Sequence, residues 1–180
     1  MTKNLFFRSL FPLALLTGIY SSSVLSSNAQ ETDPAAPTQQ KLGAWVVTCP
    51  AKNDKSGVRC AAKVNLVDQK RNVEVMSWTL GFNKDGKLLM EVLTPSEILI
   101  EPGLVYALDA LKPSTIRYYS CGIAGCLTRQ PLNAASVGLL SKAKTAKFTI
   151  ASTGGKTITL SINLAQTADA IKAIGYAATP

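Results

Sequence analysis

The stretch Tyr118-Tyr-Ser-Cys-Gly-Ile-Ala-Gly-Cys-Leu127 carries the clearest structural signal in the chain. Strand-forming aromatic residues lead into Cys121, a four-residue connection crosses from Gly122 to Gly125, and Cys126 begins a second extended run. Two extended runs about a short glycine-containing connection predict a β-hairpin. A disulfide between the two cysteines would close that hairpin, so the stretch predicts antiparallel β-structure held by a covalent cross-link.

The other two cysteines, Cys49 and Cys60, lie upstream. An even number of cysteines in an exported chain predicts two disulfides. Of the three pairings that four cysteines allow, Cys49–Cys60 with Cys121–Cys126 closes the shortest loops, and we expect it. Neither spacing is Cys-x-x-Cys and the chain has no histidine, so we expect no metal site, redox pair or other cofactor.

The N-terminus predicts export. Lys3 and Arg8 precede a short apolar core, and small residues end the segment at Ala29. This order is typical of a secretory signal peptide, so we expect residues 1–29 to be removed after Ala29. We expect the protein in the periplasm, associated with the outer membrane, or secreted. No later segment is apolar enough to predict a transmembrane span.

The remainder is expected to be one domain, residues 42–180, preceded by a flexible Pro-rich lead-in, residues 30–41. The whole chain carries 19 basic and 11 acidic residues, and the leader holds two of the basic ones and none of the acidic ones. The resulting positive excess of six, which we expect to be spread along the chain, favours anionic partners such as lipid head groups or acidic glycans. Nucleic acid is not expected as a partner, because basic-aromatic motifs are missing.

Short apolar and β-branched runs, separated by turn residues, predict many short strands. The predicted strands are residues 44–49, 59–67, 73–82, 87–93, 104–109, 115–121, 147–151 and 157–162. Asn83-Lys-Asp-Gly86 and Ser152-Thr-Gly-Gly155 predict hairpin turns. Asn133 predicts the N-cap of one internal helix, and residues 167–174 predict a second, C-terminal helix. The pattern predicts a mainly β fold, a single sandwich of short antiparallel strands.

The sequence resembles a known family, the invasion-associated locus B family. The resemblance rests on Gly43-Ala-Trp45, the first cysteine pair, Pro102-Gly-Leu-Val105 with Asp109, and the motif Cys121-x-x-x-Gly-Cys126. It extends over nearly the whole mature chain, including the downstream helix and the strand that ends at Ile162. The resemblance implies an exported β-rich bacterial protein, linked in pathogens to entry into host cells. It implies no catalytic residues.

One departure from the family lies near the C-terminus. The family usually has a Ser-Leu-x-Gly-Phe step where this chain has Asn163-Leu-Ala-Gln-Thr-Ala168. We therefore expect the apolar residue that anchors the final segment to differ.

Four carboxylates, Glu91, Glu97, Glu101 and Asp109, are the candidates for acid–base chemistry of the kind that hydrolyses glycosides. Surface carboxylates are usually only solvated, and without histidine no Ser-His-Asp or Cys-His device can form. We therefore expect no catalytic residues and no enzyme activity. Gly154-Gly155-Lys156 lacks the full phosphate-loop pattern and predicts a turn.

Lys142, Lys144 and Lys147 form a basic cluster after the internal helix and are the candidate residues for binding an anionic surface. Equally, the three lysines can simply be exposed to solvent on the surface, without binding a partner. Trp45 and Trp78 are expected to be core residues rather than sugar-binding platforms.

The sequence thus predicts a non-enzymatic interaction protein of the bacterial envelope, with envelope or host-surface partners: an anionic glycan or lipid, or a protein. Two alternatives remain: a periplasmic housekeeping or stress factor without a host role, and a glycan-acting enzyme.

Overall fold

The computed structural model describes residues 36–68 and 72–176. The predicted leader, residues 1–29, and the first part of the lead-in lie outside the described residues. Neither helix of the described part has the length and hydropathy needed to cross a membrane.

Two antiparallel sheets make up the domain, as predicted. The larger sheet has the strand order β1-β2-β3-β4-β5-β9-β8. Its strands are β1 (Thr38–Leu42), β2 (Trp45–Cys49), β3 (Ala61–Asp68), β4 (Val73–Phe82), β5 (Leu88–Thr94), β8 (Tyr118–Gly122) and β9 (Gly125–Pro131). The smaller sheet has the order β11-β10-β6-β7. Its strands are β6 (Leu104–Leu108), β7 (Ser114–Ile116), β10 (Thr145–Ala151) and β11 (Thr157–Asn163).

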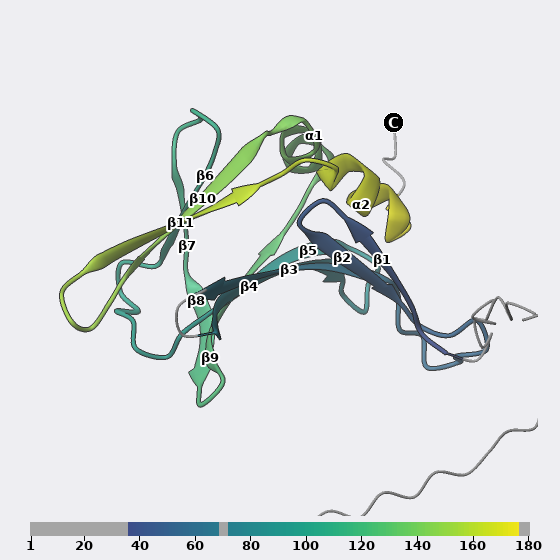
Figure 1. Ribbon diagram of the computed structural model, residues 1–180, viewed down its shortest axis with the longest axis horizontal. Helices are drawn as coiled ribbons and strands as arrows, with labels where there is room; N and C mark the ends of the chain where they lie inside the picture. The colour runs from purple at the N-terminus through teal and green to yellow at the C-terminus, as the bar shows by residue number, and fades with distance from the viewer. Residues whose placement is uncertain (1–35, 69–71, 177–180) are drawn as a thin grey trace, which may run out of the picture. The chain divides into compact units, whose positions relative to one another are not determined.

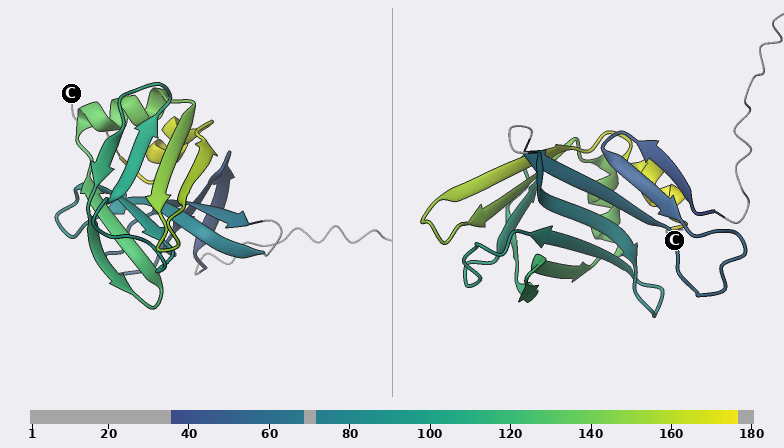
Figure 2. Two further views of the ribbon diagram at one scale, coloured as in Figure 1. Left: turned by 90° about the vertical axis from the view of Figure 1, so that its left-hand side faces the viewer. Right: turned by 60° about the horizontal axis from the view of Figure 1, so that its bottom comes forward.

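Two helices complete the domain. Helix α1 (Ala134–Lys142) begins after Asn133, whose side chain accepts a hydrogen bond from the backbone N–H of Ser136, so the predicted cap is confirmed. Helix α2 (Thr167–Ala173) confirms the predicted C-terminal helix. In Figure 1 the smaller sheet and both helices lie on one side of the larger sheet. Figure 2 shows the β10–β11 hairpin at the border of the smaller sheet.

The core between the sheets is built on aromatic side chains. Trp45 and Trp78 meet edge to face with ring centroids 4.9 Å apart, and Trp78 meets Phe148 in the same way at 5.0 Å. Tyr106 stacks on Phe148 at 5.6 Å. Both tryptophans are fully buried, which confirms them as core residues. Each such ring pair contributes about 1 kcal/mol beyond its buried area.

The final segment is anchored to this core in its own way. Leu164 is buried, and helix α2 buries Ile171 in the same core. The indole N–H of Trp45 donates to the Thr167 hydroxyl, which donates in turn to the carbonyl of Leu164. These contacts occupy the place where the sequence departs from the family pattern, so the anchor here is Leu164 together with the hydroxyl of Thr167.

Two expectations about the strands were wrong. Residues 115–121 were predicted as one strand, but the chain leaves β7 in the smaller sheet at Ile116 and enters β8 in the larger sheet at Tyr118. The buried Ile116 side chain joins the core while Arg117 between the strands is exposed, so the backbone changes sheet there.

The lead-in was predicted to be flexible up to residue 41, but Thr38–Leu42 pairs with β2. Backbone pairing orders this polar segment, and Leu42 packs against the core.

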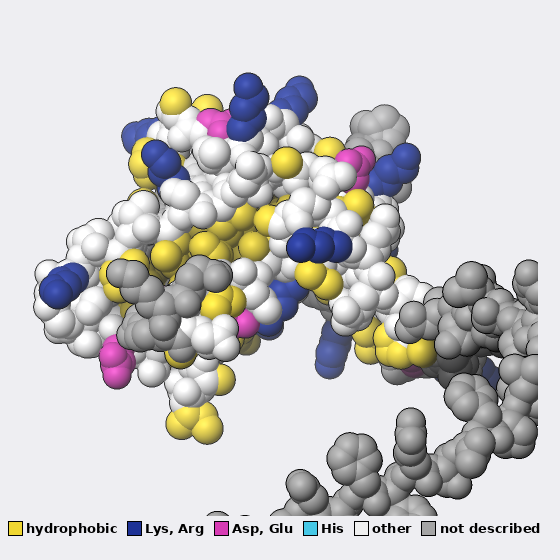
Figure 3. All heavy atoms as spheres, in the orientation of Figure 1, with side chains coloured by type: hydrophobic (Ala, Val, Ile, Leu, Met, Phe, Trp, Pro, Cys, Tyr) yellow, Lys and Arg dark blue, Asp and Glu magenta, His cyan; other side chains and the backbone are white. Residues whose placement is uncertain are grey.

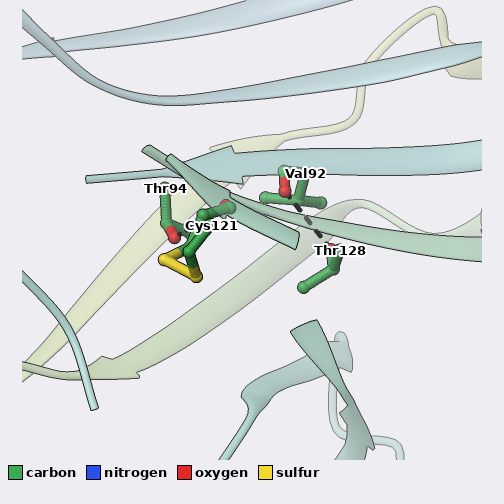
Figure 4. The surroundings of a disulfide bond; sticks show 5 residues. Val92, Thr94, Cys121 and Thr128 are labelled. Atoms are coloured by element: carbon green, nitrogen blue, oxygen red, sulfur yellow. Dashed lines mark hydrogen bonds between the residues drawn. A yellow bond between two sulfur atoms is a disulfide. The ribbon is translucent and has the colours of Figure 1, made fainter. Parts of the chain in front are cut away.

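Both disulfides join the predicted partners, Cys49–Cys60 and Cys121–Cys126. The second one lies against the larger sheet (Figure 4), where the hydroxyl of Thr94 donates to the carbonyl of Cys126. The Thr128 hydroxyl donates to the carbonyl of Val92. The two threonines are buried, so these bonds satisfy polar groups that would otherwise be costly inside the domain.

The turn between the cysteines is tighter than predicted. Gly122 pairs with Gly125, which leaves only Ile123 and Ala124 in the loop. Gly125 has a φ of 124°, and a Cβ there would overlap the carbonyl oxygen of Thr94 on the neighbouring strand. Glycine is therefore required at position 125 for both conformation and space.

Replacing Gly125 tests this requirement. We expect Gly125→Ala to lower the free energy of unfolding by about 2 kcal/mol or more, because strained backbone and a displaced β5 add together. Gly122→Ala is the matched control, since nothing lies within 4 Å of a Cβ there. Chemical denaturation of both variants measures the difference, and equal stability of the two would contradict the assignment.

Candidate interaction surface

The positive charge of residues 30–180 is concentrated, not spread as the sequence analysis expected. Residues 102–165 contain seven basic residues and one acidic residue, whereas bases and acids are equal in number over residues 30–101 and 166–180 together. This segment supplies the whole smaller sheet, helix α1 and the β8–β9 hairpin. The positive excess therefore follows one part of the fold.

The three predicted lysines lie on one continuous piece of this segment. Lys142 is in the last turn of α1, Lys144 lies in the connection, and Lys147 is on β10. All three side chains are exposed, and Lys147 alternates with the buried Ala146 and Phe148, so it faces away from the core. Figure 3 shows Lys and Arg side chains along the side of the molecule that carries α1 and the smaller sheet, and others over the rest of this face.

Three further bases of the segment, Lys112, Arg117 and Lys156, are also exposed. The seventh, Arg129, belongs to the larger sheet, where its guanidinium bonds to Glu91 at 2.6 Å and lies over the ring of Tyr119. Six bases of the segment thus have no acidic partner among the ion pairs of the described residues. We define Lys142, Lys144 and Lys147 as the basic cluster.

Asp109 fixes the backbone that carries this cluster. It has a left-handed φ of 46° directly after β6. Its carboxylate accepts hydrogen bonds from the backbone N–H of Lys144 at 3.1 Å, and from the N–H and the hydroxyl of Thr145 at 2.8 and 3.0 Å. The bonds from the Lys144 and Thr145 backbone lower the pKa of Asp109 from its ordinary value of 3.8. The one acid of the segment therefore positions the lysines.

A shallow depression of about 320 Å³ adjoins Lys142 and Asp109. Its apolar walls include Leu111 and Leu139, which are each about half exposed at 49% and 54%. Exposed leucines beside a lysine suit a partner that combines a negative group with an apolar part. Sequence analysis missed both leucines because their neighbourhood depends on the approach of α1 to the turn after β6.

The four carboxylates considered as acid–base candidates lie in different surroundings. Glu91 is paired with Arg129, and the carboxylate of Asp109 is bonded to backbone. Glu97 and Glu101 lie exposed in the connection between β5 and β6. Within the described ranges, no three Asp, Glu, Cys or His side chains come together as a metal site would require. Gly154-Gly155-Lys156 forms the β10–β11 turn, as predicted.

Comparison with known proteins agrees with this architecture. The family model described as "Invasion associated locus B (IalB) protein" matches residues 45–175. The crystal structure of invasion associated protein B from Bartonella henselae is similar, with a TM-score of 0.64 and 19% sequence identity over 76% of this chain and 95% of that chain. At that identity the similarity shows the fold alone. No curated protein matches the chain.

Asp109→Asn tests the positioning role of the carboxylate. Asparagine tolerates the left-handed backbone and keeps an acceptor oxygen, so the change isolates the negative charge. We expect a lower Tm at neutral pH. Because the folded-state pKa of Asp109 lies below 3.8, its contribution is present above that pH and is lost as the pH falls through the folded-state pKa.

The measurement is the Tm of both proteins between pH 7 and pH 2. The difference between them should shrink on acidification below about pH 4. A difference that stays constant over this range would show that the charge of Asp109 does not stabilise the turn.

Proposed function

Because the chain belongs to the invasion associated locus B family, we propose that it is an exported, non-enzymatic protein of the bacterial envelope that binds anionic surfaces. The observation that carries the proposal is the excess of bases over residues 102–165, exposed on α1 and the smaller sheet. The partners proposed are anionic lipid head groups or acidic glycans, of the bacterium itself or of a host cell.

The geometry supports loose recognition of a surface. The three lysines of the basic cluster are on a helix–strand junction, and Asp109 holds this junction by accepting hydrogen bonds from the backbone N–H groups of Lys144 and Thr145. Point charges on a fixed scaffold attract anions and bind them without strict stereochemistry. Leu111 and Leu139 next to Lys142 offer apolar contact to a lipid or to the apolar face of a sugar.

Two observations support a role without catalysis. The chain contains no histidine, so the common base of nucleophilic catalysis is missing. Of the four candidate carboxylates, Glu91 is held by Arg129 and Asp109 by the backbone after α1. A carboxylate engaged in this way is poorly placed to serve as acid or nucleophile toward a glycoside.

Export is supported by the leader-like N-terminus and by both disulfides, since such cross-links persist in oxidising compartments. We propose that the mature protein begins at Gln30 and acts in the periplasm, at the outer membrane or outside the cell. The name of the family supports a part in host-cell invasion, which would require display at the surface or secretion.

Fractionation tests this proposal. We expect the full-length chain, expressed in a Gram-negative host, to be recovered outside the cytoplasm with its N-terminus at Gln30 and no free thiol, as read by intact mass and thiol labelling. Recovery in the cytoplasm with four free thiols would contradict export. Confinement to the periplasm would favour the housekeeping alternative over a host role.

Charge reversal tests the binding surface. We expect the triple variant Lys142→Glu, Lys144→Glu, Lys147→Glu to bind vesicles of phosphatidylglycerol and phosphatidylcholine at least about tenfold more weakly, since each lysine near an anionic surface contributes about 1 kcal/mol. Co-sedimentation at low salt measures the binding, and added salt should weaken it.

The matched control reverses three exposed lysines outside the basic segment, Lys52, Lys55 and Lys84. Both triple variants have the same net charge, so only the position of the change differs. Equal loss of binding in the two would show that net charge, and not the basic cluster, attracts the vesicles.

A further inference from the structure

The two sheets have four border strands, and one of them lacks the features that prevent pairing with another chain. β1 carries Lys41, β7 has only three residues and follows Pro113, and β8 is bulged near Tyr119 and cross-linked. Charges, short length and bulges are the usual protection of sheet borders. β11 has seven residues, Thr-Ile-Thr-Leu-Ser-Ile-Asn, with no charge, proline or bulge.

The backbone groups that β11 presents to the outside can be identified. Ser152 N–H donates to the carbonyl of Lys156, and Leu164 N–H donates to the carbonyl of Lys144. In an antiparallel ladder the residues bonded to the neighbouring strand alternate, so the even-numbered residues of β11 bond to β10. Thr157, Thr159 and Ser161 therefore direct their N–H and C=O groups to the open side.

A cleft of about 590 Å³ runs along β11, between the smaller sheet and the ends of β3 and β4. Its apolar lining includes Leu66, Val73, Val75, Ile150, Ile158 and Leu160. Along β11 the burial decreases toward the turn: Ile162 is 4% exposed, Leu160 is half-buried and Ile158 is 42% exposed. Figure 3 shows hydrophobic atoms in a hollow between the two sheets. The apolar surface between the sheets thus extends beyond the closely packed core and lines an open cleft.

The charge around the cleft differs from that of the basic segment. Its lining includes the exposed carboxylates of Glu74 and Glu97 and no Lys or Arg of the described residues. Glu74 makes a long ion pair with Lys63, at 3.9 Å, and both side chains are well exposed. Two exposed carboxylates beside an apolar cleft favour a partner that carries positive charge.

We propose that β11 binds an extended peptide segment by strand addition. The segment would pair with the outward backbone groups of Thr157, Thr159 and Ser161, and it would place alternate apolar side chains into the cleft beside Ile158 and Leu160. Lys or Arg residues at its ends would meet the carboxylates of the cleft. This peptide site is separate from the basic cluster on the outer face.

The probe is the peptide acetyl-Lys-Thr-Val-Thr-Val-Thr-Val-Lys-amide, compared with the same peptide ended by Glu at both positions. We expect the lysine peptide to slow hydrogen exchange of the Thr157, Thr159 and Ser161 amides, because they gain acceptors. We expect the glutamate peptide to bind about tenfold or more weakly by calorimetry, because it faces like charge. No slowing of exchange, or equal binding of the two peptides, would overturn the proposal.

Thr159→Pro removes one outward N–H and leaves the β10 ladder intact, since proline is tolerated on border strands where the N–H faces solvent. We expect about five- to tenfold weaker binding of the lysine peptide. Thr159→Val is the control, which loses only the hydroxyl contact with Thr149 and should bind within about twofold of wild type, as an exposed hydroxyl pair contributes little.

A second variant, Ile158→Lys, leaves the backbone unchanged and puts a positive charge at the cleft. It should weaken binding of the lysine peptide about tenfold, and it tests the site even if Thr159→Pro does not fold. Unchanged binding in folded Thr159→Pro and in Ile158→Lys would overturn the proposal.

Sedimentation equilibrium tests whether β11 instead pairs with a second copy of the protein. A dimer of the wild-type chain that Thr159→Pro abolishes would assign β11 to that contact and would overturn the peptide site.

Discussion

The contact of Trp78 with Trp45 on one side and Phe148 on the other is the interaction on which the domain depends. Trp78 belongs to the middle of the larger sheet and Phe148 to the smaller one, so their edge-to-face contact joins the two sheets. Trp45 extends the same contact to Thr167 at the start of α2. Three fully buried rings thus hold both sheets and the final helix in one core.

This core explains why one sheet carries two different kinds of surface. Phe148 and Ala146 on β10 turn inward, which forces Lys147 between them outward. The same alternation on β11 turns Ile158, Leu160 and Ile162 toward the larger sheet and leaves hydroxyl side chains outside. The aromatic contacts end before the β10–β11 turn, so the sheets are packed at one end and leave a cleft at the other.

Both disulfides lie in the larger sheet, and each closes the connection between two neighbouring strands. Cys49–Cys60 closes the loop between β2 and β3, and Cys121–Cys126 closes the outermost hairpin. A covalent cross-link is most useful where few side chains pack, because it limits the freedom of the unfolded chain. The smaller sheet has no cysteine among its strands, and its border strand β11 is held by pairing with β10. The part of the domain proposed to bind partners is thus the part without covalent support.

The sequence alone determined the strands from Trp45 to Phe82, the Asn133 cap, the α2 segment and the cysteine pairs, because alternation, turn residues and short loop closure are local signals. It also contains the basic excess of residues 102–165, which is not apparent as a surface until the fold brings the smaller sheet and α1 together. Only the tertiary structure decided that the chain changes sheets at Arg117, that Thr38–Leu42 is ordered, and that β11 is an open border beside a cleft. The sheet change and the cleft depend on strands that lie far apart in the sequence, and no local pattern encodes such contacts. The order of Thr38–Leu42 comes from a local hairpin with β2, but its polar residues gave no apolar strand signal.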